Sequence, residues 1–332
     1  MRTLVLLAAF AMPLAAQQPT VQNGQSVVLP ASSLTAAIKA QRGAVWLAYT
    51  VPAIKSAHGN WDSDGIAYLE GNRREEDRRQ TVPGANYQAL VLLRVEDGTV
   101  RNLRLEEPGR TLDAGGKRVA YLPGVDPAQS LSVLQGAAEN AATNQLRDAA
   151  LFAVSMHRSS GTTATLLSLA AANHDLPLRE KAAFWLSTQY PTEALPALER
   201  WLRDDRDERF REKLTFDVSL LHTDAAADLL IRTAHDDSAP PVRKQAQFWM
   251  ASLAGKRVVG KLGDAAEADP DIDVRKSAVF ALYRLPNGEG TPRLIDLVRT
   301  SKEAAVRKQA VFWLGQSNDP RALAFLAQLV RQ

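Results

Sequence analysis

The sequence repeats a short motif at a constant interval. VRKQAQFWM begins at Val242, and the nearly identical VRKQAVFWL begins at Val306. In every copy an apolar residue precedes the arginine and a phenylalanine stands five positions after it. Aligned on the arginine, six copies follow each other at one unbroken spacing: Arg147, Arg179, Arg211, Arg243, Arg275 and Arg307. Six copies without an insertion or deletion predict a repeat architecture for this part of the chain.

A unit of about 32 residues has room for two helices of about 10–12 residues and two turns. Positions −1, +3 and +7 relative to the arginine are apolar and follow the helical period of 3.6, so the motif predicts the second helix of each unit. The first helix is expected between copies, as in EALPALERWLRDD (193–205). Asp126, Thr291 and Asp319 each precede a proline, which predicts three N-caps. Residues 321–332 are expected to form a closing helix over the end of the stack.

An aspartate stands six positions before the arginine in three copies, where Asp205, Asp237 and Asp269 precede Arg211, Arg243 and Arg275. With this feature the repeat resembles the HEAT-repeat family, specifically its short bacterial, PBS-lyase-like type, over residues 126–332. The resemblance implies that these aspartates and arginines form a hydrogen-bonded ladder between neighbouring units. Asn173 and Ser301 replace the aspartate in two copies, where the ladder is expected to break. The family includes scaffolds, adaptors and some enzymes, so the resemblance implies the fold more than the function.

A single helical pair cannot bury its own apolar face, so repetition builds a continuous core. Trp185, Trp249 and Trp313 occur in alternate copies and indicate a duplication unit of two repeats. We predict a mostly α protein, with an α-solenoid of about six helix pairs and a closing helix over residues 126–332. A small β-rich domain is expected to precede it at residues 17–125, because alternating and β-branched segments there are separated by turn signals such as Asp97-Gly98. A short helix is expected at residues 32–41.

On a helical wheel, positions +1, +5 and +8 of the motif lie together, away from the core positions. HEAT-repeat geometry implies that they line the concave surface. Two interpretations stay open: the phenylalanines wedge between adjacent helices, or they form a partly exposed surface that binds a protein or extended peptide. The tryptophans at +6 point close to the core and are interpreted as structural. The candidate surface comprises Phe152, Phe184, Phe216, Phe248, Phe280 and Phe312, with Asp148, Glu180 and Glu212 followed by Lys244, Lys276 and Lys308 at +1.

The start of the chain, residues 1–16, is typical of a secretory signal peptide. Arg2 precedes an apolar run from Leu4 to Ala16, which is too short to span a bilayer. An uncleaved N-terminal anchor is the alternative. The chain has no cysteine, which excludes disulfides and thiolate metal sites. We therefore expect an exported bacterial protein, periplasmic or extracellular, without a membrane span in the mature chain.

One segment has the oxygen ligands of a calcium loop. Asn60, Asp62 and Asp64 are followed by Gly65, but Gly71 occupies the position where a bidentate acid is needed. A polar turn is the competing interpretation, and no cofactor is expected.

Catalytic motifs are missing from the sequence. HEAT-type metal hydroxylases use His-Glu pairs as iron ligands, and none of the histidines is followed by glutamate: His58, His157, His174, His222 and His235. HExxH, GxSxG, P-loop and GxGxxG patterns are also missing. The net charge of +3 is small, and the candidate surface is acidic at one end, so no nucleic-acid partner is expected. The sequence favours a non-catalytic scaffold or adaptor. A bilin-lyase-like enzyme and a nucleic-acid-binding HEAT-like protein are the alternatives.

Overall fold

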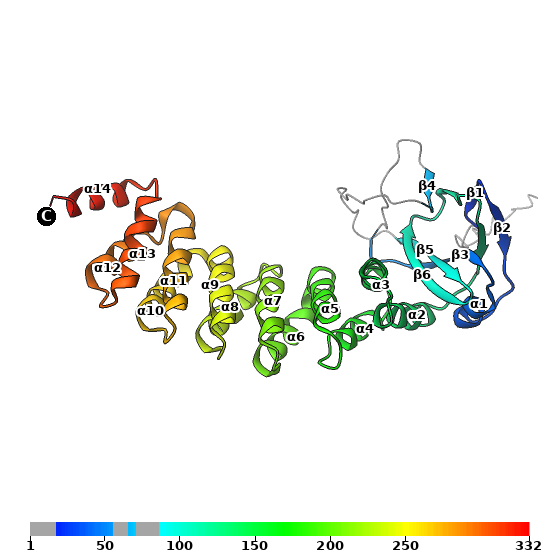
Figure 1. Ribbon diagram of the computed structural model, residues 1–332, viewed down its shortest axis with the longest axis horizontal. Helices are drawn as coiled ribbons and strands as arrows, with labels where there is room; N and C mark the ends of the chain where they lie inside the picture. Colours follow the sequence, from blue (N-terminus) through cyan, green and yellow to red (C-terminus); the bar gives the residue numbers. More distant parts are fainter. Residues whose placement is uncertain (1–17, 56–65, 71–85, 332) are drawn as a thin grey trace, which may run out of the picture. The chain divides into compact units, whose positions relative to one another are not determined.

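The computed structural model describes residues 18–55, 66–70 and 86–331 (Figure 1). Contacts between residues divide the chain into two compact units, residues 1–165 and 166–332. The signal peptide, His58 and the calcium candidates Asn60, Asp62 and Asp64 lie outside the described residues.

The described part of the first unit contains two β-sheets. The five-stranded sheet has the order β2-β8-β3-β5-β6, with β2 and β3 parallel to β8, and β5 antiparallel to both β3 and β6. The three-stranded sheet has the order β1-β7-β4 and is parallel. The strands are β1 (Thr20–Gln22), β2 (Gln25–Val28), β3 (Ala44–Pro52), β4 (Ile66–Tyr68), β5 (Gln88–Glu96), β6 (Thr99–Glu106), β7 (Thr111–Asp113) and β8 (Arg118–Tyr121).

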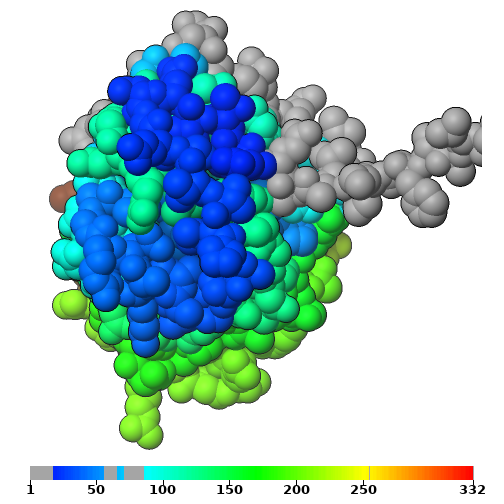
Figure 2. Space-filling view, turned by 90° about the vertical axis from the view of Figure 1, so that its right-hand side faces the viewer, coloured from blue at the N-terminus to red at the C-terminus, as the bar shows by residue number. Residues whose placement is uncertain are grey.

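Strands β3 and β5 carry nearly continuous apolar residues because both of their faces are buried. Trp46 and Leu92 belong to the face that shares a core with Leu112 of the small sheet. The β5–β6 hairpin turns at Asp97 and Gly98, both with positive φ, as a two-residue hairpin with right-handed twist requires. In Figure 2 the first described residues, in dark blue, spread over one face of this unit.

Three helices of the described residues belong to the first unit: α1 (Leu34–Ala40), α2 (Pro127–Glu139) and α3 (Asn144–Met156). Asp126 caps α2, as predicted. The predicted domain boundary after residue 125 differs from the division after Thr165. Hydrogen bonds account for the difference, because the Ile54 amide at the end of β3 donates to the carbonyl of Met156 and the Arg158 amide donates to that of Pro52.

The second unit is built from helix pairs that repeat along the chain (Figure 1). The helix α4 (Thr162–Leu169) crosses the division between the units. The second helices of the pairs are α5 (Leu176–Gln189), α7 (Glu208–Ser219), α9 (Pro240–Ala254), α11 (Ile272–Arg284) and α13 (Ala304–Gly315). The first helices are α6 (Pro191–Asp204), α8 (Asp224–Asp236), α10 (Val259–Ala268) and α12 (Thr291–Thr300). Short 3-10 turns, η1 (Gly255–Val258) and η2 (Pro286–Gly288), precede α10 and α12, and α14 (Pro320–Leu329) follows α13.

The predicted core positions −1, +3 and +7 are confirmed. In α7 they are Phe210, Leu214 and Val218, all with no exposed surface, and their equivalents in α5, α9, α11 and α13 are at most 2% exposed. Each second helix packs against the next one. The predicted fold class, an α-solenoid of about six helix pairs with a closing helix after a small β-rich region, is confirmed. One predicted cap is wrong, because α12 begins at Thr291 itself and Gly290 is its N-cap residue.

Candidate partner-binding face

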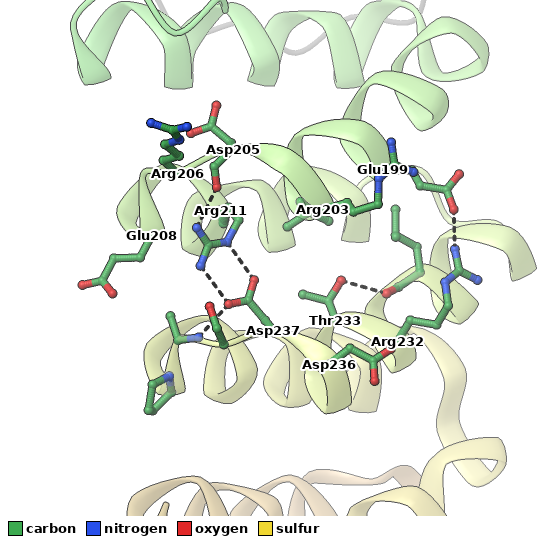
Figure 3. A pocket seen from close by; sticks show the side chains of 15 residues that line it. Glu199, Arg203, Asp205, Arg206, Glu208, Arg211, Arg232, Thr233, Asp236 and Asp237 are labelled. Atoms are coloured by element: carbon green, nitrogen blue, oxygen red, sulfur yellow. Dashed lines mark hydrogen bonds and ion pairs between the residues drawn. The ribbon is translucent and has the colours of Figure 1, made fainter.

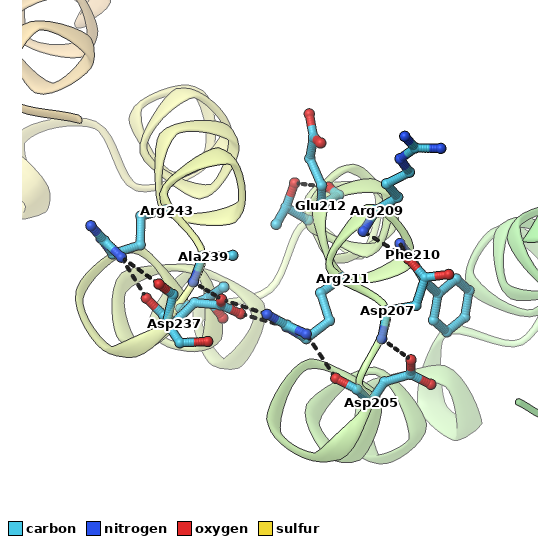
Figure 4. A network of polar contacts seen from close by, with 12 residues as sticks. Asp205, Asp207, Arg209, Phe210, Arg211, Glu212, Asp237, Ala239 and Arg243 are labelled. Atoms are coloured by element: carbon cyan, nitrogen blue, oxygen red, sulfur yellow. Dashed lines mark hydrogen bonds and ion pairs between the residues drawn. The ribbon is translucent and has the colours of Figure 1, made fainter. Parts of the chain in front are cut away.

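Arginines and aspartates connect successive repeats of the second unit (Figure 4). The Arg211 guanidinium donates to both carboxylate oxygens of Asp237, at 2.8 and 2.9 Å. Arg243 makes the same bidentate contact with Asp269, at 2.9 and 2.8 Å. In each pair the aspartate belongs to the following repeat, where it stands six positions before the arginine of that repeat. Each carboxylate therefore joins two units.

Each arginine also holds its own repeat together. Arg211 donates to the backbone carbonyl of Asp205 at 2.8 Å, and Arg243 donates to that of Asp237 at 2.8 Å. Asp237 in turn accepts the Ala239 amide at 2.8 Å. The side chains of both pairs are nearly buried. The contact within a repeat fixes the turn before the second helix, and the contact between repeats fixes how the two repeats are aligned. We call this set the Arg–Asp ladder: Arg179 with Asp205, Arg211 with Asp237, and Arg243 with Asp269.

The ladder changes at Arg275, because Ser301 stands where the aspartate of the next repeat is needed. Arg275 still donates to the carbonyl of Asp269 at 2.5 Å, within its own repeat. Its nearest acid in the next repeat is Glu303 at 3.7 Å, and that carboxylate is 44% exposed. The Arg275 pair is therefore a looser, more hydrated contact.

The phenylalanines at +5 form a continuous row of ring contacts on the second helices. Phe184 stacks on Phe216 with centroids 6.4 Å apart, and Phe248 stacks on Phe280 at 6.5 Å. Phe216 is 36% exposed and Phe312 52%, and the other three of this unit are half-buried. The rings pack between repeats and present surface to solvent together. We call this row the aromatic stripe: Phe184, Trp185, Phe216, Phe248, Trp249, Phe280, Tyr283, Phe312 and Trp313.

We call the ring contacts between two successive second helices a step of the stripe. The tryptophans at +6 take part in alternate steps. The ring centroid of Trp249 lies 5.0 Å from that of Phe216, and the ring centroid of Trp313 lies 4.7 Å from that of Phe280. Position +6 is Asp217 in α7 and Ala281 in α11, and there the phenylalanines of successive helices stack directly. The sequence places these tryptophans near the core, but they are half-buried and belong to the stripe. The close similarity of alternate copies thus corresponds to two alternating kinds of step.

The charges at +1 flank the stripe. Glu180 and Glu212 are half-buried, whereas the lysines range from half-buried Lys244 and Lys276 to exposed Lys308. Lys276 also contacts Asp273 at 3.2 Å. Burial raises the pKa of Glu180, and nearby Lys213 acts in the opposite direction. Phe152 and Asp148, the first copies of these positions, are half-buried in the first unit.

Asp217 was not singled out from the sequence. The residue is 4% exposed, and among the described residues its carboxylate has no hydrogen-bond donor. Burial raises its pKa well above the usual value, and the charge of Glu180 adds to this effect. The missing tryptophan at +6 in this copy is the signal that could have identified it.

A second polar group, in the first unit, was also missed. The Tyr49 hydroxyl lies 2.9 Å from the Ser130 hydroxyl, which lies 2.8 Å from Nε2 of His157. Nδ1 of His157 is 2.7 Å from the carbonyl of Ala153. A serine beside a histidine resembles a catalytic pair, but each of the three residues is at most 1% exposed. The group therefore joins β3 to α2 and α3 and offers no access to a substrate.

A hollow of about 890 Å³ lies between α6 and α8 (Figure 3). The Arg232 guanidinium donates to Glu199 at 2.8 Å in this hollow, and the Arg211–Asp237 pair of the ladder forms part of its wall. Arg203 and Arg206 are balanced by acids on the same wall, so the hollow has no dominant charge. In the described part of the chain, no three His, Cys, Asp or Glu side chains come together as a metal site. No helix in that part is long and apolar enough to cross a membrane.

Comparison with known proteins supports the repeat assignment. Residues 259–332 match the sequence model of HEAT repeats. The predicted resemblance to HEAT-repeat proteins is thereby confirmed, and the second unit is a HEAT-like helical solenoid. No curated protein matches the chain.

Three solved structures are similar to part of this chain. Human deoxyhypusine hydroxylase in complex with glycerol is 20% identical, with 61% of this chain and 78% of that chain covered and a TM-score of 0.34. The complex of CpcE and CpcF of phycocyanin lyase from Nostoc sp. PCC7120 is 22% identical, with 48% and 100% covered and a TM-score of 0.37. YibA of E. coli is 17% identical, with 62% and 79% covered and a TM-score of 0.39.

Proposed function

We propose that the protein is an exported, non-catalytic scaffold or adaptor that binds another protein, or an extended peptide, through the aromatic stripe. The observation that carries the proposal is the continuous row of ring contacts that leaves Phe216 and Phe312 partly exposed. Aromatic side chains that are already packed lose little conformational freedom on binding, so they are favourable anchors in interfaces. The stripe offers such anchors in every repeat of the second unit.

The charge pattern beside the stripe supports an oriented partner. Glu180 and Glu212 lie at its beginning, and Lys276 and Lys308 lie toward its end. A partner with the opposite gradient would bind in one direction only, because the reverse orientation would bring like charges together. No described feature favours a catalytic role, since the serine and histidine that lie together are buried.

Affinity capture of the tagged mature protein from its native envelope extract tests the proposal. One arm carries the wild-type chain and a second carries Lys244→Glu, Lys276→Glu and Lys308→Glu. A matched control reverses three exposed lysines that do not stand at position +1, Lys256, Lys261 and Lys302. We expect mass spectrometry to find a partner that the +1 lysine variant loses and the control retains. Equal capture in all three arms would contradict the proposal.

Export is a separate part of the proposal and rests on the leader-like residues 1–16. We expect the native protein in the envelope or extracellular fraction to begin at Gln17. N-terminal sequencing of the purified native chain tests this, and a chain that keeps Met1 in the cytoplasmic fraction would contradict it.

A further inference from the structure

The step between α5 and α7 is the only place in the described stripe where an acid occupies position +6 and the phenylalanines of successive helices stack directly. Phe184 and Phe216 stack there with an interplanar angle of 8°. Asp217 follows Phe216 directly and occupies position +6. At the equivalent position Trp249 contacts the phenylalanine of the preceding helix, so Asp217 faces α5, in agreement with its electrostatic interaction with Glu180.

A second step of the same kind shows what is missing. Phe248 and Phe280 also stack directly, but position +6 there is Ala281, and the guanidinium of Arg284 lies over Phe248 at 5.5 Å. The position equivalent to Arg284 in the α7 repeat is occupied by Leu220. Among the described residues, no cation lies over the rings of Phe184 or Phe216. The step between α9 and α11 thus has a cation over one of its rings and an alanine at +6, whereas the step between α5 and α7 has an acid at +6 and, among the described residues, no cation over its rings.

The charge that acts on Asp217 is negative, because it is that of Glu180. Glu212 and Asp207 act in turn on Glu180. Lys213 is the one ammonium group that acts on Glu180, and its side chain is exposed. A nearly buried carboxylate that accepts no hydrogen bond from the chain is costly, and the cost falls when a charged donor binds.

We propose that this step binds an arginine or lysine side chain of an extended peptide segment in the partner. The cation lies against the rings of Phe184 and Phe216, and its N–H groups donate to Asp217 and Glu180. This inference rests on the proposed function and names the chemistry of the partner at one end of the stripe. The ring faces attract the cation, and the carboxylates accept its hydrogen bonds in a partly dehydrated site. Arginine matches the site best, because its planar guanidinium can stack and donate at the same time.

Fluorescent nonapeptide pools test the inference on the full mature chain. The central residue is fixed as Arg, Lys, citrulline or Glu, and the other positions are an equimolar mixture of Ala, Leu, Ser and Gly. Citrulline keeps the shape of arginine and lacks its charge. Two variants each remove one carboxylate: Asp217→Asn in the site, and Asp264→Asn on α10 as the exposed control. Circular dichroism and thermal unfolding check that the variants fold.

We expect the wild-type chain to bind the Arg pool about tenfold or more tightly than the citrulline pool, as a stacked cation with charged hydrogen bonds implies. Asp217→Asn should remove most of this preference, and Asp264→Asn should keep it. Equal affinity for the Arg and citrulline pools, or a preference that survives Asp217→Asn, would overturn the inference. So would binding of N-acetyl-arginine amide as tight as that of the Arg pool, which would indicate a site for small cations.

The outcomes separate this inference from the proposed function. Pools that bind without a basic preference, and bind less well to Phe216→Ala, would overturn the inference and leave the stripe as a binding face. Failure of every pool would overturn the inference, whereas the lysine-reversal capture decides the proposed function independently.

Discussion

At the scale of single residues, the same repeat position has different roles in different copies. In α9, position +6 is Trp249, whose indole packs against a phenylalanine of the preceding helix. In α7, the same position is the buried acid Asp217. The pKa of Asp217 is raised in the folded chain, so folding favours its protonated form. Its contribution to stability is therefore present below the unfolded pKa of about 3.9 and is lost as the pH rises toward the raised folded value.

Asp217→Asn should therefore stabilise the chain at neutral pH. The amide cannot ionise, so it avoids the cost of a buried, unpaired charge, and we expect a gain of about 1–3 kcal/mol at pH 7. The gain should shrink toward pH 4, where Asp217 is protonated. Urea unfolding of both proteins at the two pH values measures the difference. A variant that is less stable than wild type at pH 7 would show that Asp217 has a partner in solution.

The phenylalanines of one motif should differ sharply in their contribution to stability. Phe210 at −1 in α7 has no exposed surface, whereas Phe312 at +5 in α13 is 52% exposed. We expect Phe210→Ala to cost about 3–5 kcal/mol because it leaves a cavity. Phe312→Ala should cost about 1 kcal/mol, since only part of its surface is buried. Chemical denaturation compares the two, and similar costs would show that the stripe is core.

At the scale of helices, the Arg–Asp ladder is the main polar connection between repeats. Arg243→Met would leave Asp269 buried without its partner, at an expected cost of about 3–5 kcal/mol. The double variant Arg243→Met with Asp269→Leu should recover much of this loss, because no charge is left unpaired. Arg275→Met is the matched control, with about 1 kcal/mol or less expected, because the Arg275–Glu303 pair is long and partly exposed. A double-mutant cycle in urea measures the coupling, and equal costs for Arg243→Met and Arg275→Met would contradict this view.

The joint between β3 and α3 should weaken in acid. Burial lowers the pKa of His157, so the folded state favours the neutral ring. A base with a lowered folded pKa stabilises the fold above its unfolded pKa of about 6.5, and the stability is lost as the pH falls below that value. We expect the protection factors of the β3 amides, which are corrected for the slower intrinsic exchange in acid, to fall from pH 7 to pH 5. His157→Gln should be less stable at pH 7 but lack this fall in protection. An unchanged pH response in the variant would exclude His157 as its source.

The elements with strong local signals were predictable from the sequence. The arginine motif indicated α5, α7, α9, α11 and α13, and the Asp97-Gly98 turn indicated the β5–β6 hairpin. The helix α10 has a weaker signal, with two glycines among its residues, and was not specified. The parallel pairings of β8 with β2 and β3 join distant segments that no local pattern connects. The same reason explains why Asp217 was missed, since its lack of a hydrogen-bond donor depends on neighbours in another repeat.

At the scale of the whole molecule, stability in a solenoid is close to a sum of repeat terms and nearest-neighbour terms. The alternation of two kinds of step makes the neighbour terms unequal in this chain. A deletion of residues 243–306 removes two repeats and joins Val242 to Arg307, so Phe216 meets Trp313 in place of Trp249. A deletion of residues 243–274 removes one repeat, and Phe216 then meets a helix with Ala281 at +6.

We expect the substitution Ala281→Trp to have opposite effects on stability in the full chain and in the chain that lacks residues 243–274. In the full chain Ala281 is 1% exposed beside the stacked Phe248 and Phe280, so Ala281→Trp should overpack the step and cost about 1–3 kcal/mol. In the chain that lacks residues 243–274, the same substitution restores the ring that Phe216 meets in the intact protein, and it should raise the melting temperature. Thermal unfolding followed by circular dichroism gives both signs. The same sign in both backgrounds would show that the alternation of tryptophans does not set how neighbouring repeats fit.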